Sequence, residues 1–176
     1  MDKQRITEQL TQHHEAFLKV LGNISDEKFT EPIAPGKWTP AQQLDHIHKS
    51  AGAFNVALMM PKFIWKRFGV AKSPSRSYEQ LIEDYRKILN AGGESPSRFL
   101  PAQVKLRQRS VLTTELPQII ENMNKRLKKL SEEELDKYRL PHPLLGKLTL
   151  REMGQFTIYH VQHHQLQVCP DSISEA

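Results

Sequence analysis

The last third of the chain carries two histidines whose spacing suits metal binding. His160 and His164 are four positions apart in a helical pattern, so their side chains lie on one face, one turn apart. Their Cα atoms are separated by about 6 Å along a helix axis, which lets two imidazoles converge on one divalent ion. The same face continues with apolar and small residues: Met153, Phe156 and Thr157. We therefore expect the pair to point toward a protein core.

Two histidines leave a divalent ion under-coordinated, because catalytic zinc-like sites use three protein ligands and a water. His46 and His48 are candidates for the third ligand, but they are rotated by about 200° around a helix and cannot both face one site. His48 lies nearer the centre of an apolar stripe, whereas His46 shares a face with small residues. His13 and His14 interrupt another stripe. The residues alone leave the third ligand open, and the alternative is a set of interior histidines satisfied by hydrogen bonds.

No convincing general base accompanies these histidines, so the catalytic residues stay unassigned. Glu152 is interpreted as a capping residue, and Asp45 as solvent-facing or as support for a ligand. His48 and His163 are interpreted as structural. Gln167 either supports the site through a hydrogen bond or continues a polar surface. Trp38 is interpreted as a packing anchor at the start of a helix.

Four long segments must position these side chains. Each has apolar residues spaced in threes and fours, as one face of a helix requires: 3–21, 39–60, 114–130 and 149–168. Thr39, Pro40 and Gln42 form a capping box with proline at the first helical position. Thr149 and Glu152 form a second capping box. The two segments that carry the candidate ligands therefore have well-defined starts.

The remaining segments predict shorter elements. A further helix is expected over 77–90, and Ser131 is expected to cap a short one. Residues 141–146 have turn chemistry, and alternating β-branched runs of useful length do not occur. We therefore predict an all-α four-helix bundle, formed as a single domain over residues 1–176, with a helical and loop insertion between the second and third long helices.

Composition excludes several other classes of protein. A chain of 176 residues is long enough to bury one core without disulfides, and its single cysteine, Cys169, cannot form a disulfide framework or a cysteine-based zinc site. No apolar leader and no run of eighteen apolar residues is present. We expect a cytoplasmic protein without a membrane segment.

Charge is unevenly placed along the chain. Residues 61–111 contain eleven Lys or Arg and four Asp or Glu, within a chain of formal net charge +5. The favoured interpretation is a solvated, variable insertion, and the alternative is a surface that attracts nucleic acid or an anionic small molecule. We rank nucleic-acid binding last, because no recognised DNA-binding motif occurs.

Two blocks of the sequence resemble the DinB-like family of metalloenzymes, most closely its YfiT-like branch. In the first block, Trp38 and Thr39 open a helix, and His46 follows eight positions after the tryptophan. The second block runs from His142-Pro143 through Gly146, Leu148-Thr149 and His160 to His164 and Gln167. The order, the spacing and the helix starts agree in both blocks. The basic middle segment adds nothing to the match.

This resemblance implies a four-helix bundle of up-down-down-up topology whose ligands lie on its second and fourth helices. Carried over residue by residue, the metal ligands are His46, His160 and His164. The resemblance further implies a divalent ion, zinc or nickel, and a metal-dependent hydrolase or a thiol transferase that acts on a small molecule. A low-molecular-weight thiol is then a possible co-substrate. The alternative is a non-catalytic metal-binding or interaction module.

An apolar cluster after the second long helix suggests self-association. Phe63, Ile64 and Trp65 are bulky and adjacent, so they must be buried in the chain or meet a partner. Homodimers are the commonest closed oligomers. We therefore expect a homodimer.

Overall fold

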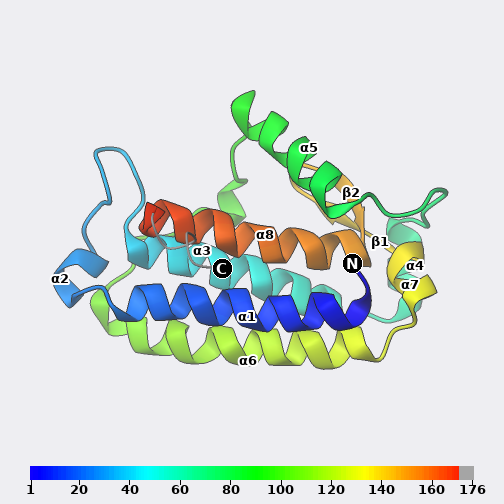
Figure 1. The fold of residues 1–176 in the computed structure, drawn as a ribbon, viewed down its shortest axis with the longest axis horizontal. Helices are drawn as coiled ribbons and strands as arrows, with labels where there is room; N and C mark the ends of the chain where they lie inside the picture. Colours follow the sequence, from blue (N-terminus) through cyan, green and yellow to red (C-terminus); the bar gives the residue numbers. More distant parts are fainter. Residues whose placement is uncertain (171–176) are drawn as a thin grey trace.

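The computed structural model describes residues 1–170 and contains four long helices that lie side by side (Figure 1). They are α1 (Lys3–Gly22), α3 (Pro40–Ala57), α6 (Arg109–Lys128) and α8 (Leu150–Val168). Helices α1 and α8 run in one direction, and α3 and α6 run in the other. Both α1 and α3 pack against α6 and α8. The structure thus confirms the predicted bundle and its up-down-down-up order.

Shorter helices connect the four long ones. They are α2 (Asp26–Phe29), α4 (Lys62–Phe68), α5 (Tyr78–Asn90) and α7 (Glu132–Lys137), with the 3-10 turns η1 (Ser97–Phe99) and η2 (Leu106–Gln108). The connection from α3 to α6 holds α4, α5 and both 3-10 turns, which confirms the predicted insertion. The sequence pattern does not predict α2, because four residues are too few to show a helical period.

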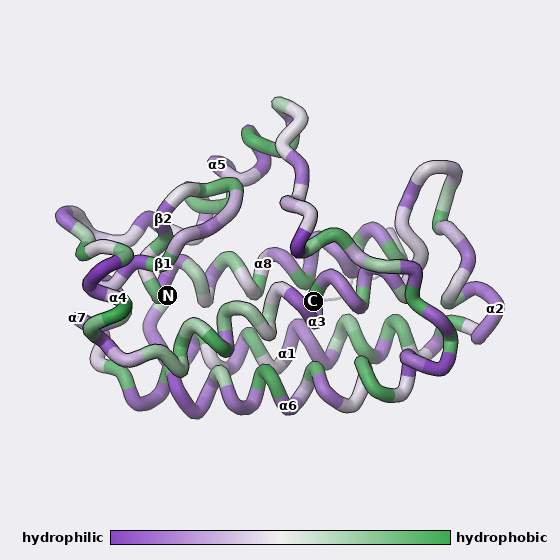
Figure 2. The backbone as a smooth tube through the Cα atoms, turned by 180° about the vertical axis from the view of Figure 1, so that it is seen from behind, coloured by the Kyte–Doolittle hydropathy of each residue, from purple (hydrophilic) through white to green (hydrophobic). Residues whose placement is uncertain are grey.

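The core lies along the axis of the bundle. Apolar and polar residues alternate along each long helix (Figure 2), so each helix presents one stripe to its neighbours. The largest fully buried side chains come from every long helix except α8 and include Phe17, Leu21, Leu44, Ile47, Leu116, Met123 and Leu127. Gly154 brings α8 close to α1, since a Cβ atom there would lie 2.9 Å from Cγ2 of Ile6.

Capping boxes fix the starts of the two helices that carry the candidate ligands. The Thr39 hydroxyl accepts a hydrogen bond from the Gln42 amide at 3.0 Å, and the Gln42 side chain accepts one from the Thr39 amide at 3.0 Å. Thr149 and Glu152 repeat this pattern at the start of α8. Both predicted boxes are confirmed, and each sets the rotational position of the histidines that follow.

A small hairpin corrects the expectation that strands are absent. Strands β1 (Arg139–His142) and β2 (Gly146–Thr149) pair antiparallel, with Leu140 opposite Leu148. Gly146 has φ 75°, a conformation that glycine adopts without strain, and it begins the second strand. Four-residue strands are too short to show a clear alternation of polar and apolar residues. The sequence therefore indicates the turn and misses the strands.

The third long helix begins earlier than predicted, at Arg109 instead of near Thr114. Contacts distant in sequence hold this first turn, because the Arg109 guanidinium donates to Leu21 O at 2.7 Å and to Ile24 O at 2.9 Å. It also pairs with the Asp26 carboxylate at 2.6 Å. Local propensity does not reveal such contacts, and Pro117 inside the helix argues locally against its length.

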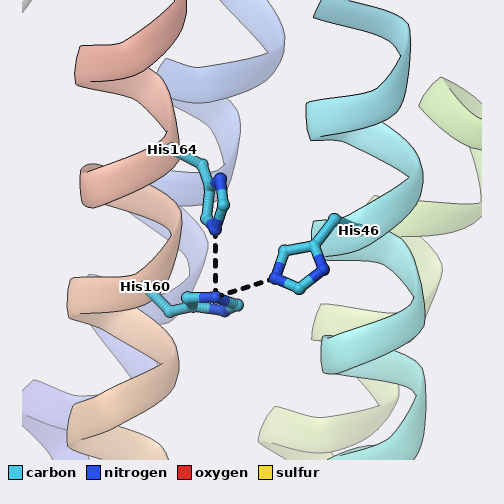
Figure 3. A group of neighbouring side chains, drawn as sticks. All are labelled: His46, His160 and His164. Carbon is cyan, nitrogen blue, oxygen red and sulfur yellow. Dashed lines mark hydrogen bonds between the residues drawn. The ribbon is translucent and has the colours of Figure 1, made fainter. Parts of the chain in front are cut away.

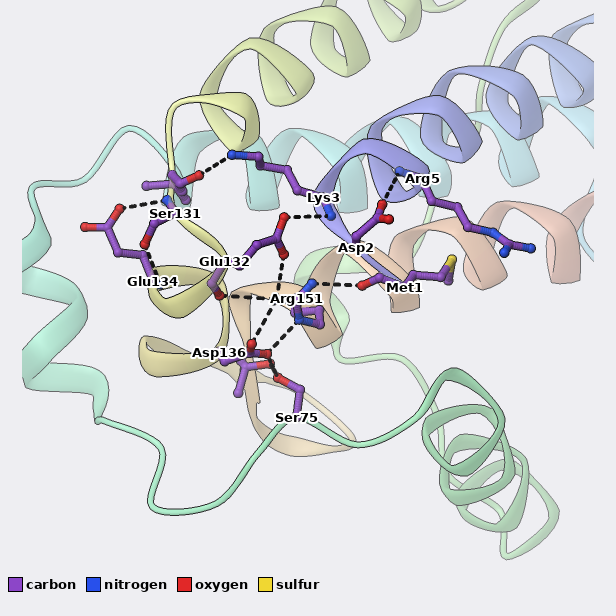
Figure 4. A network of polar contacts seen from close by, with 12 residues as sticks. Met1, Asp2, Lys3, Arg5, Ser75, Ser131, Glu132, Glu134, Asp136 and Arg151 are labelled. Atoms are coloured by element: carbon purple, nitrogen blue, oxygen red, sulfur yellow. Dashed lines mark hydrogen bonds and ion pairs between the residues drawn. The ribbon is translucent and has the colours of Figure 1, made fainter.

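An ion-pair network holds the chain together where α8 begins (Figure 4). The Arg151 guanidinium pairs with Asp136 at 2.6 Å and with Glu132 at 2.8 Å, both on α7. It also donates to the backbone oxygen of Met1 at 2.8 Å. The start of α8 is thereby tied to α7 and to the chain segment that precedes α1.

The insertion packs onto the bundle through aromatic residues. Trp65 of α4 is buried, and its indole N–H donates to Ala57 O at 2.9 Å, whereas Phe63 is 63 % exposed. Tyr85 of α5 meets Phe156 of α8 edge to face, with ring centroids 5.0 Å apart. The predicted apolar cluster of α4 is therefore divided between core and surface. Within residues 1–170, we find no helix with both the length and the apolar character needed to cross a bilayer.

Candidate metal centre

Three histidines meet in the interior between α3 and α8 (Figure 3). They are His46 from α3 and His160 and His164 from α8, and none is more than 6 % exposed. Nε2 of His160 lies 3.1 Å from Nε2 of His46 and 3.1 Å from Nε2 of His164. The structure thus brings together the three residues that the family resemblance implies as ligands.

Hydrogen bonds at the outer edges of two rings orient their Nε2 atoms inward. Nδ1 of His46 lies 2.7 Å from the backbone oxygen of Phe99, which can only accept, so Nδ1 carries the proton. Nδ1 of His164 meets the side-chain oxygen of Gln43 in a short hydrogen bond and carries the proton for the same reason. In the neutral rings, Nε2 of His46 and Nε2 of His164 are therefore unprotonated, and each carries a lone pair.

The three histidines cannot supply a hydrogen-bond donor to both of these lone pairs. The Nε2 position of His160 can hold one proton, which serves one of the two facing lone pairs and not both. A divalent ion would satisfy all three nitrogens. With bonds of about 2.0–2.1 Å, tetrahedral geometry places neighbouring nitrogens about 3.3 Å apart, close to the 3.1 Å contacts found here. All three ligand atoms lie within 4.8 Å of one another, and this donor set fits a three-histidine metal site with one position left for water or substrate.

The electrostatic surroundings keep the three imidazoles neutral. Burial lowers the pKa of His160 and of His164 well below the usual value of 6.5, and neighbouring imidazoles add to the effect. Burial also lowers the pKa of His46, although its hydrogen bond to the Phe99 oxygen opposes this. Metal ligation needs the neutral form of histidine, so these rings are prepared to bind an ion at neutral pH.

Gln43 contacts the histidine cluster, and sequence reasoning misses it. Its side-chain oxygen accepts from His164, and its amide nitrogen donates to the side-chain oxygen of Gln167 at 2.9 Å. Gln167 therefore supports the site through Gln43, which resolves the two interpretations of that residue. The available signal was the spacing of Gln43, three positions before His46 and hence on the same helix face.

Trp38 contacts the site more closely than a packing anchor would. Its ring stacks parallel to His164, with an interplanar angle of 5° and centroids 6.0 Å apart. It also lies 5.1 Å from the His46 ring. Trp38 thus closes one side of the histidine cluster and fixes the orientation of two of its rings.

The remaining candidate residues lie outside the cluster. His48 pairs with Glu115 at 2.9 Å near the surface, and His163 meets the Gln167 side chain at 2.8 Å. His13 lies beside Gln162. These positions agree with the structural interpretation of His48 and His163.

Neither acidic candidate supplies a general base. Glu152 binds the amide and the guanidinium of Arg76, each at 2.9 Å. Burial alone would raise the pKa of Glu152, but these hydrogen bonds outweigh it and lower that pKa. Asp45 is buried and pairs with Lys49 at 2.6 Å. Both carboxylates are thus engaged in ion pairs, and the solvent-facing interpretation of Asp45 is wrong.

A cavity of about 560 Å³ opens beside the histidine cluster and includes His160 in its wall. Its other walls come mainly from α3, α8 and the hairpin. The lining is largely apolar and includes Ala53, Phe54, Ala57, Leu140, Met153 and Phe156. His14, His142 and Thr157 are polar groups within it. This volume suits a small organic molecule placed beside the candidate ligands.

The fold is a helical bundle, and its buried three-histidine cluster has a donor set that fits a metal ion. The family model of the DinB superfamily matches residues 9–168, so this chain belongs to the DinB superfamily.

Two Bacillus subtilis proteins are similar to this chain. The uncharacterized protein YuaE of strain 168 is 26 % identical over 148 residues, which cover 84 % of this chain and 85 % of YuaE. The solved structure of YfiT, described as a probable metal-dependent hydrolase with an unusual four-helix bundle topology, aligns with a TM-score of 0.58 at 16 % identity. That alignment covers 96 % of this chain and 84 % of YfiT, and it supports the shared fold.

Proposed function

We propose that this protein is a metal-dependent enzyme that binds a divalent cation, zinc or nickel, through His46, His160 and His164 and acts on a small molecule. One observation carries the proposal: three buried Nε2 atoms converge beside a cavity, and two of them are lone pairs fixed by hydrogen bonds at Nδ1. Three protein ligands leave a coordination position for catalysis, which a closed structural site lacks.

Two reaction types suit such a centre. A bound ion supplies either a water of lowered pKa for hydrolysis or a site where a low-molecular-weight thiol is held as the thiolate. The description of YfiT as a metal-dependent hydrolase favours the first reaction type. The apolar cavity supports a small organic substrate for either reaction, because its lining is largely apolar and includes the candidate ligand His160.

The residues around the cluster have distinct roles in this proposal. Gln43 and the Phe99 carbonyl hold His164 and His46 in the tautomer that presents Nε2. Trp38 packs against His46 and His164, and His160 forms part of the cavity wall, so substrate approaches the cluster from the cavity.

A non-catalytic metal-binding module is the second candidate. It is favoured by the engagement of both acidic candidates, since Glu152 pairs with Arg76 and Asp45 pairs with Lys49. Under this alternative the ion stabilises the contact between α3 and α8, and the protein catalyses no reaction.

Activity screening separates the two candidates. Zinc-loaded and nickel-loaded protein should be assayed with aryl esters and amides, and separately with cysteine and chlorodinitrobenzene. We expect turnover in one screen, loss of turnover in a His160→Ala variant, and full activity in a His48→Ala control, whose side chain lies outside the cluster. Equal rates for the wild type and His160→Ala would reject the enzymatic proposal.

Self-association remains a prediction. The exposed apolar side chains that favour it are Val56, Met59 and Phe63, which are 55 %, 61 % and 63 % exposed. Light scattering of the wild type and of a Phe63→Ser variant tests this, because a dimer built on this surface dissociates in the variant. A monomeric wild type at high concentration would remove the prediction.

A further inference from the structure

The cavity beside the histidine cluster contains a second kind of histidine. His142 is the last residue of β1, is 8 % exposed and forms part of the cavity wall. Its ring meets Phe156 edge to face at 4.3 Å, and Phe156 in turn stacks on His160 at 5.0 Å. One aromatic ring therefore separates His142 from the candidate metal ligand, so His142 faces the cavity without belonging to the cluster.

Backbone hydrogen bonds fix the tautomer of His142. Its Nδ1 accepts hydrogen bonds from the Leu144 amide at 3.2 Å and from the Leu145 amide at 3.0 Å. A backbone N–H can only donate, so Nδ1 must be unprotonated. The proton of the neutral ring is therefore on Nε2. This is opposite to His46 and His164, whose Nδ1 atoms carry the proton.

The Nε2–H of His142 is left for the cavity. The Nδ1 edge of the ring is occupied by the hairpin turn, and within residues 1–170 no protein group accepts a hydrogen bond from Nε2. Burial lowers the pKa of His142 to about 4, and the charge of Arg76 adds to this, so the ring is neutral at pH 7. A neutral imidazole with a fixed N–H is a hydrogen-bond donor suited to an oxygen that carries negative charge.

We propose that His142 is a substrate-binding residue of the cavity, whose Nε2–H donates a hydrogen bond to a carboxylate or carbonyl oxygen of the substrate. The inference rests on the proposed function and deepens it, because it specifies the substrate. The substrate would carry one group that binds the metal and an oxygen that reaches His142. These two groups are separated by about the width of the Phe156 ring. An apolar middle part fits against Phe156 and Met153.

Two substitutions test the Nδ1 and the Nε2 positions of His142 separately. In His142→Asn the side-chain oxygen takes the place of Nδ1, so it still accepts from the turn amides, but no donor reaches the position of Nε2. In His142→Gln the amide nitrogen reaches toward the Nε2 position and restores a donor there. A purely structural role in the turn predicts a normal Asn variant and a damaged Gln variant, and substrate binding predicts the reverse for ligand affinity.

The test uses zinc-loaded full-length protein and two thiols, 3-mercaptopropionate and propanethiol, measured by calorimetry. Both thiols offer a sulfur to the metal, and the first alone carries a carboxylate. We expect 3-mercaptopropionate to bind the wild type roughly 10- to 100-fold more tightly than propanethiol, as a hydrogen bond to a charged group allows. This preference should vanish in His142→Asn and return in part in His142→Gln, with zinc content unchanged in both. Nitrogen NMR should show a protonated Nε2 on His142 that shifts when 3-mercaptopropionate is added.

Several outcomes would overturn the inference. The wild type would bind both thiols equally, the preference for 3-mercaptopropionate would survive in His142→Asn, or NMR would show an unprotonated Nε2 on His142. A surviving preference would assign the carboxylate to Lys49 and Arg98, the cationic residues of the cavity wall. Zinc content and propanethiol binding report on the proposed metal site alone, so its failure is distinguishable from the failure of this inference.

Discussion

The two ends of α8 use polar residues in opposite ways. In the first turn, Arg151 pairs with Asp136 and Glu132, and Glu152 pairs with Arg76. In the last turns, His160 and His164 are as buried as Glu152 but have no carboxylate partner among their hydrogen bonds and ion pairs within residues 1–170. The first arrangement satisfies its charges inside the protein, whereas the second leaves neutral lone pairs that a cation would satisfy. This contrast separates an end of α8 that stabilises the fold from an end whose donor set fits a bound cation.

The largest expected effect is on folding, at the paired end. Replacing Glu152 by Ala removes the capping box of α8 and leaves Arg76 without its main partner. We expect the free energy of unfolding to fall by about 3 kcal/mol, while the protein that remains folded still binds one metal ion per chain. Denaturant unfolding and elemental analysis measure the two effects. In Glu152→Gln, which keeps the cap and loses the charge, the loss should be smaller, and equal losses would show that the cap adds nothing beyond the ion pair.

Acid should weaken the fold through buried neutral histidines. Nδ1 of His14 donates to Leu10 O at 2.7 Å, and burial lowers its pKa from 6.5 to about 4. The unfolded chain then binds a proton that the folded chain does not, so stability is complete above pH 6.5 and falls as the pH drops toward 4. The slope is about 1.4 kcal/mol per pH unit for each such histidine.

A His14→Leu variant tests this pH dependence. Urea unfolding of metal-free protein between pH 7 and pH 5 should show a shallower pH dependence in the variant than in the wild type. Identical pH dependence in both proteins would mean that His14 is protonated in the folded state.

A smaller effect, on metal affinity, is expected when Gln43, the hydrogen-bond acceptor of His164, is replaced. In Gln43→Leu the His164 Nδ1 proton loses its acceptor, so zinc affinity should fall by about 10- to 100-fold with helical content retained. Chelator competition measures the affinity. Gln167→Leu is the matched control, because Gln167 contacts Gln43 and no ligand. Equal losses in the two variants would place the effect in general packing instead of in the orientation of His164.

The smallest effect is expected at a surface histidine. His48 pairs with the half-exposed Glu115 and lies outside the cluster. We expect His48→Gln to change the free energy of unfolding by less than about 0.5 kcal/mol and to leave zinc stoichiometry unchanged. Loss of metal in this variant would contradict the division of the histidines into two groups.

The sequence predicts the helices well because their signals are local. Capping residues and apolar spacing lie within each segment, so the starts at Thr39 and Thr149 and the four long helices agree with the structure. His160 and His164 are recognisable for the same reason, as a pair within one helix. The choice of His46 over His48 depended on family resemblance, because the opposing helix decides which face is buried.

The features that the sequence misses depend on contacts between distant segments. The early start of α6 is held by Arg109 against α1 and α2. Gln43 shows its role only when α3 lies beside α8, and the hairpin strands are too short to carry a period of their own. Prediction from the sequence therefore fails where a residue is defined by a partner far along the chain.

Elemental analysis of protein purified without an affinity tag tests the central claim most directly. The wild type should be compared with His46→Ala, His160→Ala and His164→Ala variants after reconstitution with zinc or nickel, with circular dichroism as a control for folding. We predict about one ion per chain in the wild type and loss of the ion in each variant, with helical content preserved. A wild type that binds neither metal, or variants that all retain the ion, would contradict the three-histidine site.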